Sequence, residues 1–490
     1  MTKKYIGLDI GTTTIKISVV DKQLVSFYEK QYDYDYLTPH KNWTEINPDT
    51  WLEIVLEGLK ELFQQIPEKN VSGIGITGQM HTTVFVDKYG FSVRPAIMWN
   101  DNRTKDMIPF IKEKLLVNEQ TADLAKVVST GSPLANLLWL KECEPENYQR
   151  TEKILIAKDY LIWKLTEVYS TDYCDASVSS FYDLNEDTWS ESVQQLFDLN
   201  SSLFPEINYS SKVVGSLSKT IQQQLGIQKV IPVVAGTGDN VASALVSGSF
   251  VHDQPLISLG TSGVVVIPNR YHQLKATGKN VVAKINEEDH TIITQGTVQA
   301  GAKVNSWWLE NILHTKDYLK EQEKISDQLI SNNEVLFFPH LNGEKTLYGE
   351  PNVRGAFAGL SLETTQEEMY LAVLEGLTFG IKNLYEKMKN DQEPAYFSIV
   401  GGGAKSELWL QLFADILNYP IRRVVNSREA VQGAAILAIL GIDNQFDFPE
   451  NDFQTFEPRE DKKINYEKKY ADYTALAQAI LTYTEAVKER

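Results

Sequence analysis

A dense group of small polar residues lies between two apolar runs at the beginning of the chain. The stretch "YIGLDIGTTTIKISVVD", Tyr5 to Asp21, gathers an aspartate, glycine and three consecutive threonines at one bend. A tight bend needs only one glycine and one polar residue. Backbone amides and threonine hydroxyls can donate to phosphate oxygens, and glycine lets the backbone approach closely. The candidate residues are Gly11, Thr12, Thr13 and Thr14, with Lys16 to neutralise charge and Asp9 to hold Mg²⁺ through water. On motif grounds alone, a structural hairpin explains the stretch about as well as a phosphate site.

A second polar group follows the apolar run "VIPVV", in "AGTGDN" from Ala235 to Asn240. An aspartate after glycines is usually a helix cap, because Asp is a preferred N-cap residue. The functional interpretation makes Asp239 a general base at a strand-to-helix turn. Asn240 would then hydrogen-bond a substrate hydroxyl beside it.

The third group is "GITGQMHTT", from Gly75 to Thr83. A histidine at the end of a strand, such as His81, is more often structural than catalytic. Together with Gln79, however, it suits a polyol, whose hydroxyls need paired donors and acceptors.

Two glycine-rich turns occur in the second half of the chain. "LGTSG", from Leu259 to Gly263, repeats the pattern of the first bend and predicts a second phosphate hairpin. "VGGGAKSELW", from Val400 to Trp409, has three consecutive glycines before a helix, more than turn geometry requires. These glycines indicate close backbone approach to a flat or phosphorylated ligand, and a strained turn is the alternative.

The elements that position these groups follow from hydrophobic periodicity. Apolar alternation predicts strands on both sides of each hairpin bend, a strand at "VSGIGIT" and another at "TTVFVD". A helix is expected at about 47–65, with Trp51, Val55 and Leu59 on one face. The tail after about Asp443 is charged, and we expect it to be helical from Tyr466 and to pack on the outside.

The pattern of Tyr5–Asp21, an apolar strand, a bend rich in glycine and hydroxyl residues and a second apolar strand, recurs at Leu256–Ile267. This repeat indicates two similar domains. Each would contribute one phosphate-facing hairpin to a shared cleft, with a boundary between Ser247 and Asp253. A chain of 490 residues with 42% hydrophobic residues is long enough for two cores.

Net charge, cysteine content and hydrophobic runs indicate which partners and which compartment to expect. The net charge of -18 disfavours nucleic acid, yet it does not exclude ATP, because local amides and a metal dominate inside a cleft. Cys143 and Cys174 have no zinc-site spacing and predict reduced, packed thiols. A strand begins almost at once, without a signal peptide, and "AVQGAAILAILGI" is too short to cross a membrane. We therefore expect a cytoplasmic protein with no membrane partner.

Taken in this order, the motifs resemble those of the FGGY carbohydrate kinases, from Tyr5 to about Gly441. A signature of that family is similar to "GAFAGLSLETTQEEMYLAVLE", and another to "SPLANLLWLKE", in which Asn136 stands for the usual lysine. The resemblance implies an α/β fold with two actin-like (ribonuclease-H-like) ATPase domains around an ATP and sugar cleft. Residues 1–248 would form the domain with the sugar site and first phosphate loop, and 249–443 the nucleotide domain. Residues 444–490 would be a helical tail packed on the second domain.

Within the family, "GQMHTTVFVD", "RPAIMWNDNR" and "KDYLIWKLT" look most like the xylulose kinases. Thr82 replaces a common glycine. "NDNR" replaces the usual "NDGR" and, with "SPLANLLWLKE", leans toward the gluconate kinases.

The resemblance also implies roles for single residues. Asp239 is the expected catalytic base, and Asp9 and Asp239 are expected to hold Mg²⁺ through water. The sugar site would contain Gln79, Met80, His81, Asp239 and Asn240. The nucleotide site would contain Gly11, Thr12, Thr13, Thr14, Lys16, Gly260, Thr261, Gly301, Asn305, Gly402, Gly403 and Ala404.

The implied reaction transfers the γ-phosphate of ATP to the C5 hydroxyl of D-xylulose, with gluconate as the alternative acceptor. A buried carboxylate needs a cationic partner, and "GQMHTT" and "GTGDN" contain no Lys or Arg. Arg103 could supply one if it pointed inward. A non-catalytic actin-like nucleotide or sugar sensor is the alternative of another class, although it would not need Asp239 beside a polyol-binding pair. The small-molecule partners are the sugar and ATP, and a homodimer stays open.

Overall fold

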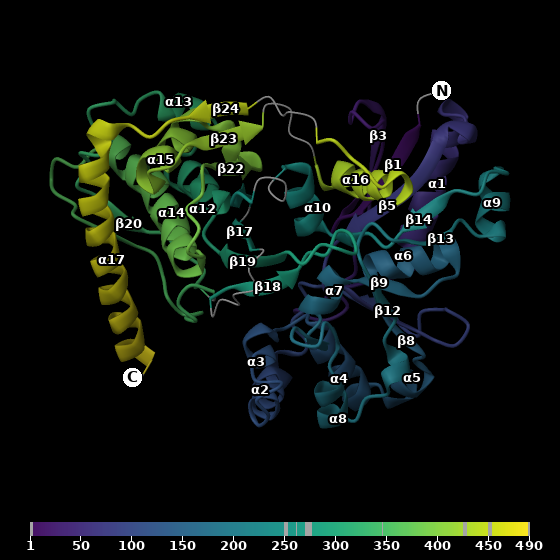
Figure 1. Cartoon of the computed structure of the whole chain (residues 1–490). Helices are drawn as coiled ribbons and strands as arrows, with labels where there is room; N and C mark the ends of the chain where they lie inside the picture. Colours follow the sequence, from purple (N-terminus) through teal and green to yellow (C-terminus); the bar gives the residue numbers. More distant parts are fainter. Residues whose placement is uncertain are drawn as a thin grey trace. The chain divides into compact units, whose positions relative to one another are not determined.

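The computed structural model describes residues 3–248, 253–260, 262–269, 277–344, 346–424, 429–448 and 453–488. It divides into two compact units, drawn in Figure 1. Unit 1 contains Met1–Gly248, Val281–Ile292 and Arg428–Glu450, and unit 2 contains Ser249–Asn280, Ile293–Ser427 and Asn451–Arg490. None of the helices in these ranges combines the length and apolar character that a membrane span needs.

A seven-stranded sheet in the order β13-β14-β5-β1-β2-β3 organises unit 1, and β15 also pairs with β5. The expected first hairpin is confirmed, since β1 and β2 are antiparallel with Asp9 opposite Lys16. β5 runs parallel to β1, and β15 runs parallel to β5. The bounds are β1 Lys4–Ile10, β2 Thr14–Val20, β3 Ser26–Asp33, β5 Val71–Gly78, β13 Val213–Ser216, β14 Pro232–Val234 and β15 Thr237–Gly238.

Helices cover both faces of this sheet. α1 (Asp49–Gln65) buries Trp51, Val55, Leu59 and Leu62, and Gly58 lets it approach Ile17 of β2. α16 (Ala430–Asp443) packs on β1 and β5 at Gly7 and Gly75, positions that face the side of the sheet opposite α1. A β-carbon on Gly7 would lie 1.9 Å from the carbonyl oxygen of Val431, so this helix requires glycine beneath it.

The position of α16 differs from the expected boundary. We expected 430–443 to belong to the second domain, whereas contacts with β1, β5 and α10 assign this helix to unit 1. The physical reason is that Gly7 and Gly75 have no side chains, which leaves room for α16 to lie directly on the sheet. The contact division ends the first stretch of unit 1 at Gly248, and the predicted domain bounds stay a prediction.

The rest of unit 1 contains a four-stranded sheet, β4-β7-β6-β8, and several short helices. Both cysteines are free: Cys174 is buried, while Cys143 is exposed at the end of α4, so the expectation that both pack is wrong for Cys143. The further elements are β4 Glu45–Ile46, β6 Thr83–Val86, β7 Ala96–Ile97, α2 Ile108–Leu116, α3 Leu124–Val127, α4 Pro133–Cys143, α5 Pro145–Arg150, β8 Lys153–Ile156, α6 Ala157–Thr166, β9 Ser170–Asp172, α7 Tyr173–Val178, β10 Tyr182–Asp183, β11 Thr188–Trp189, α8 Glu191–Phe197, β12 Glu206–Asn208, α9 Lys219–Leu225 and α10 Asp239–Val246.

Unit 2 contains a second seven-stranded sheet, in the order β18-β19-β17-β16-β22-β23-β24. Its hairpin of β16 and β17 is antiparallel, and β22 runs parallel to β16, which repeats the arrangement of β2, β1 and β5. The bounds are β16 Leu256–Leu259, β17 Gly263–Asn269, β18 Lys279–Val282, β19 Ile292–Val298, α12 Ala302–Trp307, α13 Tyr318–Gln322, β20 Leu336–Phe338, β21 Ala356–Ala358, α14 Gln366–Met388, β22 Phe397–Val400, α15 Glu407–Leu417, β23 Ile421–Val424, β24 Phe453–Phe456 and α17 Glu460–Lys488.

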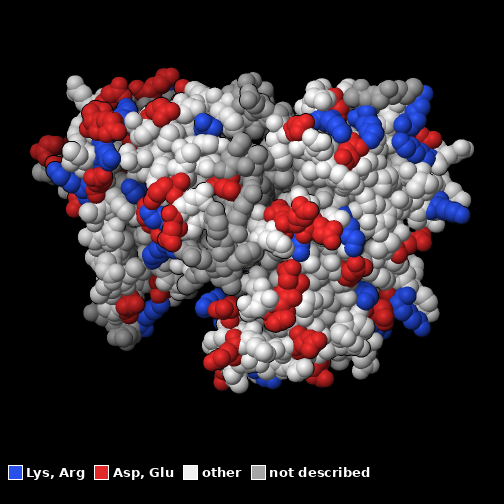
Figure 2. Space-filling model, in the orientation of Figure 1, with Lys and Arg blue, Asp and Glu red and all other residues white. Residues whose placement is uncertain are grey.

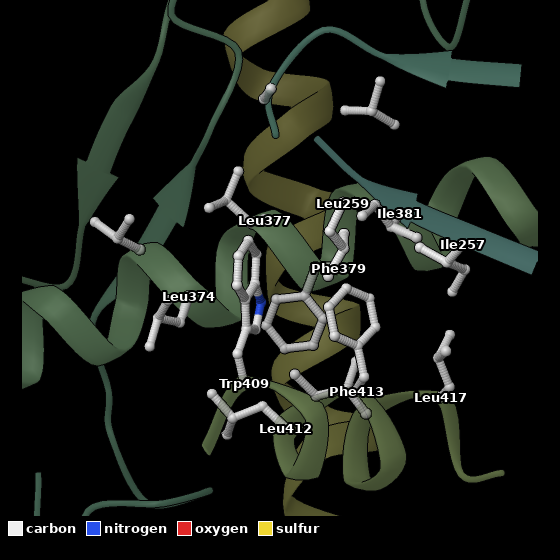
Figure 3. Packing of buried hydrophobic residues seen from close by; sticks show 14 of the residues in the cluster. Ile257, Leu259, Leu374, Leu377, Phe379, Ile381, Trp409, Leu412, Phe413 and Leu417 are labelled. Atoms are coloured by element: carbon white, nitrogen blue, oxygen red, sulfur yellow. The ribbon is translucent and has the colours of Figure 1, made fainter. Parts of the chain in front are cut away.

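The core of unit 2 lies between the sheet and the helices α14, α15 and α17. Figure 3 shows Trp409 and Phe413 of α15 beside Phe379 of α14, all buried. α17 begins at Glu460, six residues before the start predicted at Tyr466. A buried ion pair of 2.5 Å between Lys469 and Glu375 attaches it to α14. Figure 2 shows Asp and Glu interspersed with Lys and Arg on the visible face of both units.

Candidate functional site

Three parallel strand ends bring the polar groups of unit 1 to one edge of its sheet. Ile10 of β1 pairs with Gly78 of β5, and Gly78 pairs with Gly238 of β15. Adjacent strands lie about 4.8 Å apart, so β1 and β15 are separated by roughly 10 Å at their ends. The first hairpin bend, the Gln79 segment and Asp239 therefore all begin at this edge.

Asp239 is the first residue of α10, after Gly238 in the N-cap position. Its Oδ1 accepts a hydrogen bond of 2.7 Å from the backbone N–H of Asn240. Burial raises the pKa of Asp239 to about 6, and the helix amides oppose the rise. A carboxylate with a pKa near neutrality is a suitable general base, because it is ionised at neutral pH yet accepts a proton readily. A cap and a general base would both place Asp239 at this helix start, so its catalytic role stays a prediction.

Asp9 lies two strands away from Asp239. Burial, together with the charges of Asp239 and Glu429, raises the pKa of Asp9 to about 7 against the opposing charge of Lys16. Its Oδ1 is enclosed and accepts no hydrogen bond within the described chain. Mg²⁺ prefers oxygen ligands and keeps several waters, so this unpaired oxygen fits a water-mediated metal site. The described residues contain no group of three His, Cys, Asp or Glu side chains able to hold a metal directly.

The hairpin bend is held by its own backbone and by Tyr34. The N–H of Gly11 donates to the carbonyl of Thr14 over 2.9 Å, and the hydroxyl of Tyr34 donates to the carbonyl of Gly11. Thr13 is exposed, while Thr12 and Thr14 are partly exposed. Lys16 is ion-paired with Glu429 over 2.5 Å, so its charge is partly offset.

The residues predicted for the sugar site lie in two different environments. Met80 lies against Gly238, and its sulfur accepts from the side-chain amide of Asn240 over 3.7 Å. His81 follows with a positive φ of 69°, a conformation that a non-glycine residue rarely adopts. Met80, His81, Asp239 and Asn240 are thus collected at the ends of β5 and β15.

Gln79 has a different environment from the one expected. Its side chain is 2% exposed, and its Nε2 donates to the carbonyl of Gly11 over 3.1 Å. Its Oε1 accepts from the hydroxyl of Thr82 over 2.9 Å. The amide is therefore used inside the chain, and Gln79 supports the bend rather than facing an opening.

Trp99 lies beside the first bend and was not among the site residues predicted from the sequence. Its side chain is 47% exposed, and its indole N–H donates to the hydroxyl of Thr12 over 3.0 Å. A tryptophan inside the polar run "MWNDNR" was the available signal. The structure thus adds an aromatic surface beside the first bend.

Arg103 points into the protein interior. Its side chain is fully buried and forms ion pairs of 2.7 Å with both Asp101 and Glu45. The guanidinium carbon lies 3.9 Å from the ring centre of Trp43 and 4.8 Å from that of Trp139. All of its charge is therefore engaged within unit 1.

Unit 2 collects the remaining candidates around the β16–β17 turn and the glycines after β22. Gly301 is the N-cap residue of α12, and a β-carbon on it would lie 2.3 Å from the backbone of Ser262. The N–H of Ala302 donates to the carbonyl of Gly260 over 2.9 Å. Ala404 is buried beside the glycine turn, and Thr261 lies outside the described residues. A cavity of about 240 Å³ is lined by Ala302, Asn305, Ser306, Leu309, Glu310, Lys316, Tyr318, Gly402, Gly403, Ser406 and Trp409.

Unit 1 thus has two carboxylates at one end of its sheet and unit 2 has a glycine-lined cavity, and each unit has a hairpin of the same arrangement. The chain matches the models of the FGGY family of carbohydrate kinases, N-terminal domain over residues 4–246 and C-terminal domain over residues 256–442. It therefore belongs to the FGGY family of carbohydrate kinases, and it is an enzyme that phosphorylates a sugar.

Individual relatives are similar along the whole chain. The xylulose kinase of Staphylococcus xylosus is 32% identical over 471 residues, which cover 95% of this chain and 94% of that protein. The crystal structure of a "xyloylose kinase" from Brucella ovis has a TM-score of 0.90 at 27% identity, covering 98% of this chain and 100% of that one. A gluconate kinase from Lactobacillus acidophilus has a TM-score of 0.87 at 23% identity, covering 98% of each chain. The expected fold class, α/β with two actin-like ATPase domains, is confirmed by these neighbours.

Proposed function

We propose that this kinase transfers the γ-phosphate of ATP to the terminal C5 hydroxyl of D-xylulose. The observation that carries the choice of sugar is the burial of Arg103. Gluconate differs from a ketose by its carboxylate, which needs a cation or several donors to offset desolvation. Arg103 already binds Asp101 and Glu45 and has no exposed surface for another anion. The other residues predicted for the sugar site, Met80, His81 and Asn240, include no Lys or Arg, which suits a neutral sugar.

The reaction depends on positioning and charge neutralisation. Asp239 accepts the proton of the attacking hydroxyl, and its raised pKa favours this transfer. His81 and Asn240 orient the sugar through its other hydroxyls. The amides and hydroxyls of the Gly11–Thr14 bend donate to the transferring phosphoryl group.

Mg²⁺, when bound, would neutralise the phosphate oxygens. Asp9 would hold this metal through water, and the unpaired Oδ1 supports the assignment. Asp239 contributes a second carboxylate at the same sheet edge. Kinases of this family use ATP, and we assign the nucleotide to the cavity of unit 2, where Gly402 and Gly403 allow close approach of the base.

A coupled ADP-release assay over D-xylulose, L-ribulose, L-xylulose, glycerol and D-gluconate tests the proposal. D-xylulose should give the highest kcat/KM, and D-gluconate should be turned over poorly. If gluconate gives the highest value, the xylulose assignment is wrong, while the family membership stands. ATP turnover that no sugar stimulates would instead favour the non-catalytic sensor.

A further inference from the structure

Hydrogen bonds join the first hairpin bend and the Trp99 segment in a closed ring. Starting at the bend, the carbonyl of Gly11 accepts from Nε2 of Gln79 over 3.1 Å. The Oε1 of Gln79 accepts from the hydroxyl of Thr82 over 2.9 Å, and that hydroxyl accepts from the backbone N–H of Trp99 over 3.1 Å. The indole N–H of Trp99 then donates to Thr12, which is covalently joined to Gly11.

Thr82 is the central member of this ring. Its side chain is fully buried, and its hydroxyl is both the donor to Gln79 and the acceptor from Trp99. A glycine at this position would supply neither bond. The link between bend and Trp99 segment through Gln79 thus depends on one hydroxyl of this chain.

Further contacts hold the backbone at Trp99 and at Gln79, the two segments that Thr82 connects. Gly131 lies under the carbonyl of Trp99, where a β-carbon would be 2.3 Å from the oxygen. The Gln79 N–H donates to the carbonyl of Ile10 over 2.8 Å. A rigid connection between two anchored segments transmits a shift of one segment to the other, because packed interiors deform in discrete steps.

We propose that Thr82 is a positioning residue that couples occupation of the sugar site to the phosphate-binding bend. This inference rests on the proposed function, in which the bend contacts phosphate and the Met80–His81 segment contacts sugar. Thr82 lies directly after His81 in the chain, so a sugar bound at His81 acts on the ring at its centre. The ring then holds the bend in its productive position when sugar is present, which raises turnover above sugar-independent ATP hydrolysis.

The experiment compares Thr82→Val, Thr82→Ser and the wild type, with Thr121→Val as the matched control. Thr121 is also a fully buried threonine of unit 1, and its hydroxyl donates to the carbonyl of Leu115, away from the ring. Valine keeps the shape of threonine and removes the hydroxyl, whereas serine keeps the hydroxyl. The sugar used is the one with the highest wild-type kcat/KM.

Thr82→Val should lower kcat by about 10- to 100-fold, as expected for a misplaced reacting group, with a smaller change in KM. The ratio of sugar-stimulated to sugar-independent ATP hydrolysis should fall about tenfold on the same grounds. Thr82→Ser should restore both, and Thr121→Val should change neither. A Thr82→Val enzyme whose kcat stays within about twofold of wild type would overturn the proposal.

Amide hydrogen exchange keeps the ring testable if no sugar in the panel is turned over. Thr82→Val should speed exchange in peptides covering 9–14 as well as 98–103, and Thr82→Ser and Thr121→Val should not. Faster exchange in 98–103 alone would mean that no coupling reaches the bend, and the proposal would be wrong. Absence of sugar turnover in the wild type would contradict the proposed function separately.

Discussion

Replacing Asp9 by asparagine should lower the maximal rate and at the same time stabilise the fold above neutral pH. Burial, Asp239 and Glu429 raise the pKa of Asp9 from 3.8 to about 7 against the opposing charge of Lys16. Between these two pH values the folded protein holds a proton that the unfolded chain has released. The free energy of unfolding therefore falls as the pH rises from about 4 to about 7, and the stabilising contribution of the proton is lost above that.

The size of the effect follows from the two pKa values. A difference of about three pH units corresponds to about 4 kcal/mol at about 1.4 kcal/mol for each unit. Asp9 is partly exposed, so water relieves some of this cost, and about 2 to 4 kcal/mol is the expected gain for Asp9→Asn at pH 8. At pH 5 the gain should be less than half as large, because the folded carboxyl is then neutral.

Urea unfolding of both proteins at pH 5 and pH 8, in EDTA and without nucleotide, measures this difference as a shift in midpoint at constant slope. In the coupled assay the variant should need more Mg²⁺ and reach a lower maximal rate. An Asp9→Asn protein that is no more stable than wild type at pH 8 would refute the electrostatic argument. Unchanged Mg²⁺ dependence would refute the metal role alone.

Further predictions concern the base, its ionisation and two buried cations. Asp239→Ala should lower kcat by about 10²-fold or more while ADP binding, measured by calorimetry, stays close to wild type; a near-normal rate would exclude Asp239 as the base. The wild-type kcat/KM should decline as the pH is lowered through about 6, because the protonated carboxyl of Asp239 cannot accept a proton, and a flat profile from pH 7 to pH 5 would contradict this. Arg103→Met should destabilise the protein by about 3 to 5 kcal/mol, because the buried carboxylate of Asp101 loses its cation and Glu45 keeps only Arg94, without improving the use of gluconate relative to xylulose. Lys158→Met should cost a similar about 3 to 5 kcal/mol, since Lys158 is buried within 3.2 Å of three carboxylates, whereas Lys126→Met, at an exposed pair, should leave the urea midpoint unchanged. Equal midpoints for the two lysine variants would show that the buried cluster carries no special stability.

The sequence by itself determined the parts of the protein that depend on local chemistry. The bend from Gly11 to Thr14 and the turn at Gly260 follow from glycine and hydroxyl residues between apolar strands, and both hairpins formed as expected. The place of Asp239 at the start of a helix was readable for the same reason. These features involve residues close in the chain, so short patterns suffice to predict them.

Only the tertiary structure decided where the longer polar side chains point. Arg103 could have faced a substrate, but Glu45 and Trp139, both distant in the sequence, hold it in the interior. The side-chain amide of Gln79 could hydrogen-bond a sugar, yet it is already hydrogen-bonded to the carbonyl of Gly11 and the hydroxyl of Thr82. A side chain takes the direction in which its hydrogen bonds and charge are satisfied, and partners that arrive from elsewhere in the fold leave no periodic or local pattern in the chain.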